Sequence, residues 1–259
     1  MESCLETAST LFPGKVSLDL IFGWPGQTMD MWVEELKQIL HVCDKHLSLY
    51  QLTVEKGTQL YTQVKSGELH VASPDLSEDM YLHAVQFLER NGFERYEISN
   101  FAKEEQYCIH NISYWNGGEY IGVGPGAHGR FMPVGKSERE ARVQTLSPDA
   151  WMKEVEMRGH GTRSVLSLSP HERLEELLVV GLRTKWGIPH QTWSELQPQL
   201  SLTSLTQSPV LQQYFESGLL ELRSRGLRAS KKGMNVIDTI IVSLLDVLNE
   251  GQGSRTSVT

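Results

Sequence analysis

Residues 15–54 constrain the fold most, because they combine two strand patterns and one helix pattern in a short stretch. Residues 15–22 alternate between polar and apolar side chains and then become apolar, which is typical of a buried strand. Gly23-Trp24-Pro25-Gly26 follows and predicts a tight loop at its end. Apolar residues recur at helical spacing after Thr28, and residues 47–54 return to a strand pattern. Strand, helix, strand is the parallel crossover unit, so the sequence predicts an α/β fold.

Further helix and strand signals follow this unit. Ser73-Pro74 is a typical helix start, Asn91-Gly92 a typical end, and residues 93–98 then have the pattern of a strand. Beyond Pro133 the chain becomes polar and charged over residues 135–145, and most later elements have a helical pattern. We therefore expect a domain boundary there, with domains at 1–133 and 134–250 and a disordered tail at 251–259.

The second predicted domain contains a clear helix start. Ser169-Pro170-His171-Glu172 is a capping box with proline in the first helical position, and the helix that follows has an apolar stripe. The order of the later elements is helix 209–217, strand 219–222, strand 227–228 and helix 232–249. That order predicts a winged-helix-like unit within a mainly helical domain.

Composition excludes several classes of protein. The net charge of −8 over 259 residues argues against a general nucleic-acid binder, and a solvated hairpin explains the five cations between Arg223 and Lys232. The most apolar run, residues 236–248, is interrupted by Asp238 and Asp246 and is too short to span a bilayer. The first ten residues contain no Lys or Arg and predict no targeting peptide.

Residues 108–129 have the composition of a site. They hold two histidines, two tyrosines, a tryptophan and several glycines, which a surface connection does not need. His110 is a candidate metal or heme ligand or general acid, and the alternative is a histidine satisfied by a backbone carbonyl. Tyr114 and Trp115 are candidate walls for a macrocycle and Asn111 a candidate to orient the ring, or all of them belong to the core.

Two weaker signals complete the motifs. Residues 124–129 match the dinucleotide fingerprint G-x-G-x-x-G, but no helical pattern follows, so the glycines are interpreted as positions of unusual dihedral angle or close backbone approach. His128 lies among these glycines and ranks below His110. Asp19 is a charged residue within a predicted strand. It either faces a ligand or is a structural acid that pairs with another side chain.

Several separated motifs resemble one family. Residues 16–28, 49–55, 57–58 and 96–102 resemble the radical S-adenosylmethionine (radical SAM) family of oxygen-independent coproporphyrinogen oxidases. Within it, His110-Asn111-x-x-Tyr114-Trp115 and Gly122-x-Gly124-x-Gly126-Ala127-His128-Gly129 resemble the HemW branch of heme chaperones. The resemblance implies the C-terminal portion of a partial (β/α) radical SAM barrel followed by the HemN-type C-terminal domain.

The resemblance also implies site residues. His110 matches the histidine by which the HemW branch is thought to hold heme, with Asn111, Tyr114 and Trp115 beside it, and Asp19 and Thr53 match S-adenosylmethionine contacts. Family members carry a Cys-x-x-x-Cys-x-x-Cys loop for a [4Fe-4S] cluster. Cys4, Cys43 and Cys108 do not have this spacing, so we expect an N-terminally truncated form without the cluster and without radical chemistry.

The function implied by the resemblance is that of a mitochondrial heme chaperone that binds heme and delivers it to acceptor hemoproteins. One alternative is a fragment of an oxygen-independent coproporphyrinogen III oxidase of porphyrin biosynthesis. Another is a nucleic-acid- or protein-binding module that uses the winged-helix part. An incomplete barrel would leave an open strand edge, which predicts self-association.

Overall fold

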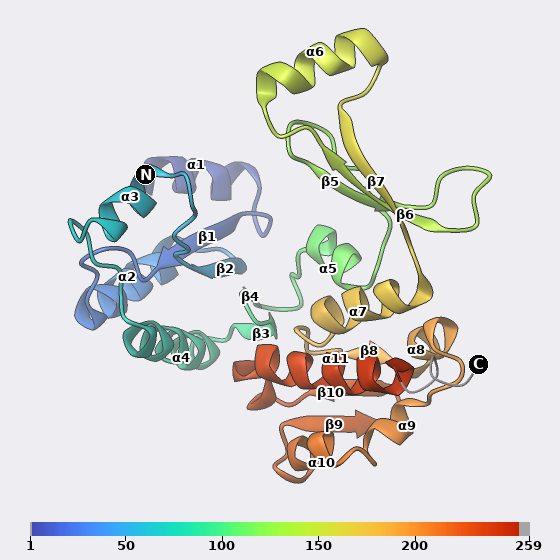
Figure 1. Ribbon diagram of the computed structural model, residues 1–259. Helices are drawn as coiled ribbons and strands as arrows, with labels where there is room; N and C mark the ends of the chain where they lie inside the picture. Colours follow the sequence, from blue (N-terminus) through green and yellow to red (C-terminus); the bar gives the residue numbers. More distant parts are fainter. Residues whose placement is uncertain (1, 254–259) are drawn as a thin grey trace. The chain divides into compact units, whose positions relative to one another are not determined.

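A computed structural model describes residues 2–253 and comprises two compact units, one before and one after the junction of Cys108 and Ile109 (Figure 1). Pro133, where the sequence predicts a boundary, lies within the second unit, in the connection between two paired strands. The predicted tail at 251–259 begins within a helix that runs to Gly253, and its remaining residues lie outside the described part of the chain.

The first unit is a four-stranded sheet with helices. Its sheet has the order β1-β2-β4-β3, in which β1 and β2 are parallel and β4 is antiparallel to both of its neighbours. The strands are β1 (Ser17–Phe22), β2 (His46–Gln51), β3 (Glu94–Glu97) and β4 (Asn100–Ala102). The helices are α1 (Glu2–Leu11), α2 (Met29–Val42), α3 (Gln59–Lys65) and α4 (Pro74–Arg90).

The predicted crossover is confirmed. Thr28 caps α2 by accepting from the Met31 amide, and α2 joins the parallel strands β1 and β2. The core between sheet and helices contains Phe22 stacked on Trp32, with ring centroids 5.6 Å apart. The Trp32 indole donates to the Met80 carbonyl at 2.9 Å and so ties α2 to α4. Helix packing against one face of the sheet therefore accounts for the alternation of more and less exposed side chains along β1.

The two faces of β1 differ in burial. Phe22 is buried and Leu20 is half-buried on the helix-covered face, whereas Asp19 and Ile21 are exposed on the other. In the described part of the chain β1 pairs only with β2, so it is the edge strand of this sheet. The self-association expected through such an edge stays a prediction.

The second unit contains two three-stranded sheets and seven helices within residues 109–253. One sheet, of order β5-β6-β7, consists of β5 (His128–Phe131), β6 (Arg139–Gln144) and β7 (Thr162–Leu168). The other, of order β8-β10-β9, consists of β8 (Ile188–Pro189), β9 (Leu220–Arg223) and β10 (Gly226–Ala229). The helices are α5 (Ile109–Trp115), α6 (Pro148–Arg158), α7 (Pro170–Gly181), α8 (His190–Leu196), α9 (Leu202–Leu205), α10 (Pro209–Glu216) and α11 (Ile237–Gly253), with a 3-10 turn at Gly233–Asn235.

The expectation of a mainly helical region after Pro133 was wrong for β6 and β7. Strand β6 is highly charged, yet its buried acid is paired: Glu140 is 1% exposed and accepts from both Lys136 and Arg142. Neutralising partners let a charged segment form the central strand of a sheet, which composition alone argues against.

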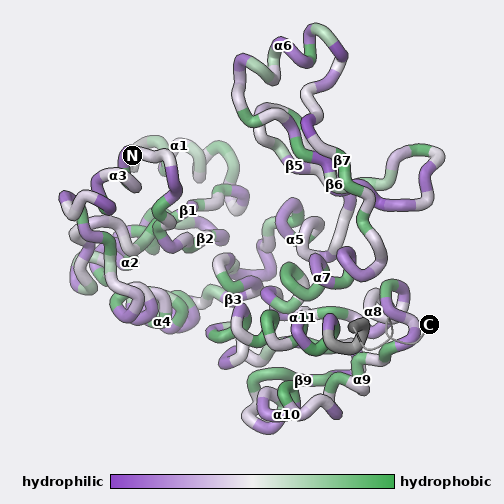
Figure 2. Tube along the Cα trace, in the orientation of Figure 1, coloured by the Kyte–Doolittle hydropathy of each residue, from purple (hydrophilic) through white to green (hydrophobic). Residues whose placement is uncertain are grey.

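The capping box and the apolar stripe of α7 are confirmed. The Ser169 side chain accepts from the Glu172 amide, while the Glu172 carboxylate accepts from the Ser169 amide. The apolar stripe of α7 is buried, and α7 packs on α11. Figure 2 shows stretches of hydrophobic residues along both helices. The buried residues of the α7 stripe are Leu174, Leu177, Leu178 and Leu182.

The C-terminal hairpin β9-β10 lies between α10 and α11 in the chain, in the order that the sequence predicts for a wing. Ile188, Trp193 and Leu227 are buried around this sheet, so it shares the core of the helices. In residues 2–253 no helix is both long and apolar enough to cross a membrane.

Candidate functional site

Helix α5 carries all four residues of the His-Asn-x-x-Tyr-Trp motif. His110 is exposed and lies in the first turn, and no hydrogen bond to its imidazole is present within residues 2–253. Its ring packs against Tyr114 in a T-shaped contact, with centroids 4.6 Å apart and ring planes at 75°. Asn111 and Trp115 are half-buried and engaged in other contacts. The two ring nitrogens of His110 are thus accessible to a ligand.

A second aromatic contact extends from α5 toward β5. Tyr114 meets Tyr120 edge to face, with ring centroids 4.4 Å apart and planes at 72°. Tyr120 in turn pairs through its backbone with Arg130 of β5, by hydrogen bonds of 2.7 and 2.8 Å. The aromatic row His110, Tyr114, Tyr120 is therefore fixed to the β5-β6-β7 sheet.

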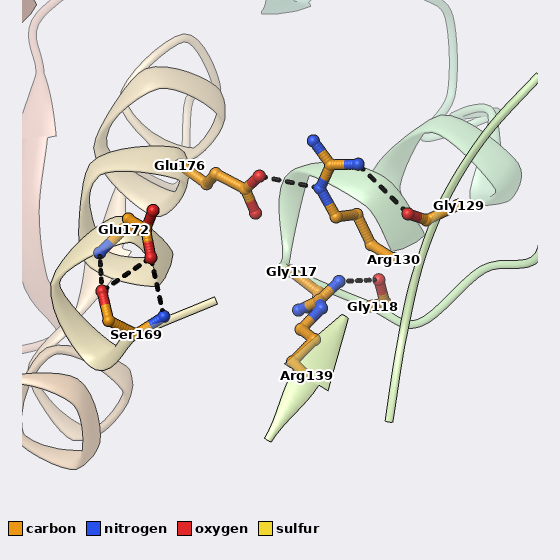
Figure 3. A network of polar contacts seen from close by, with 8 residues as sticks. All are labelled: Gly117, Gly118, Gly129, Arg130, Arg139, Ser169, Glu172 and Glu176. Carbon is orange, nitrogen blue, oxygen red and sulfur yellow. Dashed lines mark hydrogen bonds and ion pairs between the residues drawn. The ribbon is translucent and has the colours of Figure 1, made fainter. Parts of the chain in front are cut away.

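Two arginines connect this row to the neighbouring elements. Arg139 of β6 donates to the carbonyl oxygens of Gly117 and Gly118, each at 2.7 Å, which holds the turn after α5 (Figure 3). Arg130 of β5 donates through Nε to Glu176 of α7 at 2.7 Å (Figure 3). The Arg130–Glu176 bond is charge-assisted, and Arg139 makes two hydrogen bonds. Together they hold the segment that follows α5 more firmly than such a short helix would by itself.

The glycines of residues 122–129 serve backbone geometry. A Cβ on Gly122 would lie 2.1 Å from the His128 carbonyl oxygen, so two chain segments approach closely there. Gly124 and Gly126 have positive φ of 109° and 69°. The segment leads into strand β5 and not into a helix, which is consistent with interpreting the dinucleotide fingerprint as chance.

A pocket of about 900 Å³ lies in the second unit between α5, the β5-β6-β7 sheet and α7. Tyr114 and Tyr120 line it together with apolar side chains such as Leu166 and Leu177. Arg139 and Arg173 line it as well, and sequence reasoning did not identify them. Nothing in the sequence marks these arginines, because they lie on β6 and α7 and meet only through the fold.

Asp19 and Thr53 belong to the first unit and so lie apart in the chain from the α5 motif. Asp19 is exposed on β1, opposite Ser48 of β2 in the strand register. Thr53 is exposed and follows the end of β2. Their role as S-adenosylmethionine contacts stays a prediction.

The first unit contains a polar chain, with His46 and Tyr96 buried, that sequence reasoning also missed. The His46 imidazole bonds through Nδ1 to the Ser17 hydroxyl at 2.7 Å and through Nε2 to the Tyr96 hydroxyl at 2.6 Å. Burial lowers the pKa of His46, and the nearby Asp19 carboxylate opposes this shift. Ser17 and His46 are register partners in adjacent strands, a relationship that appears only once the strands are paired.

The described cysteines do not form a metal site. Cys4, Cys43 and Cys108 are free, and no group of three His, Cys, Asp or Glu side chains that could hold a metal ion is present in residues 2–253. Burial raises the pKa of the Cys43 thiol to about 11, which disfavours the thiolate that iron requires. These residues do not fit a [4Fe-4S] cluster.

The basic residues of the β9-β10 hairpin are partly neutralised. Arg223 and Arg228 both contact Glu221, at 3.0 and 2.8 Å. Arg223 and Arg228 therefore have an acidic partner, which favours the interpretation as a solvated hairpin.

Comparison with known proteins identifies relatives over almost the whole chain. The chain is 49% identical to radical S-adenosyl methionine domain-containing protein 1, mitochondrial, of Bos taurus over 97% of its length, and 47% identical to that of Mus musculus over 98%. It is 32% identical to the heme chaperone HemW of Bacillus subtilis (strain 168) over 79% of its length. The chain spans 58% of the length of the two mammalian relatives and 52% of the bacterial one.

The domain and the fold agree with these relatives. The family model described as the HemN C-terminal domain matches residues 168–236. The structure of coproporphyrinogen III oxidase (HemN) from Escherichia coli, a radical SAM enzyme, superposes with a TM-score of 0.72 at 17% identity. That match covers 93% of this chain and 57% of the other, and it establishes a mixed α/β fold. The chain belongs to the HemN/HemW family of radical SAM proteins.

Proposed function

We propose that this chain binds heme through the His110 imidazole and takes part in delivering heme to acceptor hemoproteins. The observation that carries the proposal is the exposed His110 ring, which has no hydrogen-bond partner within residues 2–253 and packs against Tyr114. A neutral imidazole with an accessible nitrogen is a common axial ligand of heme iron. The heme chaperone named among the relatives supports the same assignment.

The surroundings of His110 support a macrocyclic ligand. Tyr114 and Tyr120 offer flat aromatic surfaces next to the imidazole, and the neighbouring pocket has apolar walls. A porphyrin is a flat apolar body, so these surfaces stabilise it by burial and stacking while His110 holds the iron. The exposure of His110 suits a site that must also release its cargo.

Catalysis by radical chemistry is not part of this proposal. Residues 2–253 contain no fitting set of ligands for an iron-sulfur cluster, so no step is assigned to S-adenosylmethionine cleavage or coproporphyrinogen decarboxylation. Asp19 and Thr53 are assigned, by the family resemblance, to a part of the S-adenosylmethionine pocket. The first unit is proposed as the C-terminal portion of a radical SAM barrel, and the β8-β10-β9 region as a winged-helix-like unit.

A mitochondrial location is proposed from the names of the relatives in Bos taurus and Mus musculus. Fractionation of cells that express the full-length gene product tests it, and recovery outside mitochondria would contradict it.

A heme titration of the purified chain tests the heme proposal. The wild type is expected to give a saturable Soret band with one heme per chain, and His110→Ala to weaken binding by about tenfold or more, since an iron ligand is lost. His128→Ala is the matched control, because His128 is also exposed and lies in the same unit. Loss of heme binding in His128→Ala but not in His110→Ala would mean that His128, and not His110, is the iron ligand. Equal heme binding by all three proteins would refute the proposal.

A further inference from the structure

The pocket of the second unit combines apolar walls with an unusual set of charges. Leu166 is a pocket-lining side chain that remains 55% exposed, as is expected where an apolar ligand covers it. Three arginines line the same pocket, namely Arg130, Arg139 and Arg173, together with four glutamates, namely Glu172, Glu175, Glu176 and Glu195. An apolar pocket with several guanidinium groups is suited to a ligand that has an apolar body and an acidic end.

Arg173 has no direct polar partner for its side chain in the described residues. Its Nε is buried, and within residues 2–253 its side chain has neither a hydrogen bond nor an ion pair. None of the pocket glutamates forms an ion pair with Arg173 in the described residues. Glu172 bonds to Ser169, Glu175 to His171, Glu176 to Arg130 and Glu195 to Gln191. A half-buried guanidinium without a partner is costly, so the position favours an anion that comes from outside the chain.

Arg139 is in a similar state. Its two terminal nitrogens hold the Gly117 and Gly118 carbonyls, but its Nε is buried and without a partner in the described residues. Burial lowers the pKa of Arg139 and the positive charge of Arg173 lowers it further, while Glu176 acts in the opposite direction. Both guanidinium groups line the same pocket and each has a buried Nε without a partner in the described residues, so an anion bound there could accept from both.

We propose that Arg173 and Arg139 form a carboxylate-binding site in the pocket, and that it holds a propionate of the bound porphyrin. This inference rests on the proposed heme function and names the groups that orient the ring. Tyr114 connects the two parts of the site, because it lines the pocket and also contacts the His110 ring at 4.6 Å. A guanidinium binds a carboxylate through strong charge-assisted hydrogen bonds.

The test compares porphyrins with free and esterified propionates. Wild-type protein is titrated with heme, with heme dimethyl ester, and with the metal-free porphyrin and its dimethyl ester, followed by absorbance and fluorescence. The variant is Arg173→Met, since replacing Arg139 would also release the turn at Gly117. Arg163→Met is the matched control, because Arg163 is exposed on β7 and does not line the pocket.

We expect wild-type protein and Arg163→Met to bind each free acid about tenfold more tightly than its ester, the effect of one charge-assisted hydrogen bond. Arg173→Met is expected to lose this preference while its affinity for the esters stays unchanged. Equal affinity of wild type and Arg173→Met for the free acids would overturn the inference and leave His110 ligation intact. Circular dichroism shows whether Arg173→Met folds. If it does not, the wild type alone decides, and equal affinity of the wild type for a free acid and its ester overturns the inference.

The metal-free porphyrin separates this inference from the proposed function, because it has no iron for His110 to bind. If Arg173→Met loses the preference for the free acid while His110→Ala leaves heme affinity unchanged, the carboxylate site is supported and His110 is refuted as the iron ligand. Failure of the wild type to bind either porphyrin would refute both.

Discussion

The His46 Nε2 atom lies 2.6 Å from the Tyr96 hydroxyl, and this contact joins β2 to β3 although the two strands are not neighbours in the sheet. The same hydroxyl accepts from the backbone amide of Cys108 at 3.1 Å, so it also fixes the last residue of the first unit. Burial is the main reason that the pKa of His46 is lowered and that of Tyr96 is raised. Both groups are therefore neutral in the folded protein near pH 7.

This pairing predicts that the first unit loses stability in mild acid. The unfolded His46 takes up a proton near its ordinary pKa of 6.5, whereas the folded imidazole resists protonation. The contribution is present in full above that pH and is lost as the pH falls toward the lowered folded pKa. Denaturant unfolding of the wild type between about pH 7 and about pH 5 is expected to give a falling free energy, and His46→Gln a flatter profile.

His70→Gln is the control for this measurement, because His70 is exposed in the loop between α3 and α4. Its pH profile is expected to follow that of the wild type. A profile for His46→Gln as steep as that of the wild type would contradict the assignment to His46.

The capping box of α7 predicts a local stability effect. Ser169→Ala removes the acceptor of the Glu172 amide and is expected to cost about 1 kcal/mol in the free energy of unfolding. Ser208 has the same position at the start of α10 but makes no side-chain cap hydrogen bond, so Ser208→Ala is the matched control. Chemical denaturation measures both, and equal losses would show that the Ser169 cap contributes nothing specific.

The core of the second unit predicts a larger effect. Leu178 is fully buried on α7, and Leu178→Ala is expected to cost about 3 kcal/mol because it removes buried methyl groups and leaves a cavity. Val179, the next residue, is 41% exposed, so Val179→Ala is expected to cost well under 1 kcal/mol. Thermal unfolding compares the two variants, and a similar loss from both would contradict the burial described for α7.

The aromatic row next to His110 predicts a graded effect on heme binding. Tyr114→Ala removes the contacts to His110 and Tyr120, and is expected to weaken heme binding about threefold to tenfold. Tyr114→Phe keeps both ring contacts and is expected to bind heme as the wild type does. The Soret titration distinguishes these outcomes, and a loss in Tyr114→Phe equal to that in Tyr114→Ala would mean that the hydroxyl and not the ring matters.

Local patterns predicted much of the fold because several elements are specified by residues near in sequence. The cap at Thr28, the crossover around α2 and the capping box at Ser169 all depend on contacts within one helix or its flanking strands. Strands β6 and β7 were missed for the opposite reason. Glu140 becomes acceptable in a sheet only through Lys136 and Arg142, so the pattern of β6 alone does not predict a strand.

The candidate site divides in the same way. His110 and Tyr114 are one helical turn apart, so their spacing and residue types already indicate a site. Arg139 lies on β6 and Arg173 on α7, with α6 and β7 between them in the chain, and their shared pocket exists only in the folded unit. Long-range partners of this kind leave no local pattern.

The edge position of β1 also determines how its amides exchange with solvent. The Phe22 carbonyl accepts from the Leu52 amide at 2.8 Å, so the backbone groups of Leu20, two residues earlier, point to the same side, toward β2. The amides of Asp19 and Ile21 then point away from β2. Slow hydrogen exchange at Asp19 and Ile21 therefore reports that a further strand has paired with β1, and fast exchange reports that the outer side is open to water.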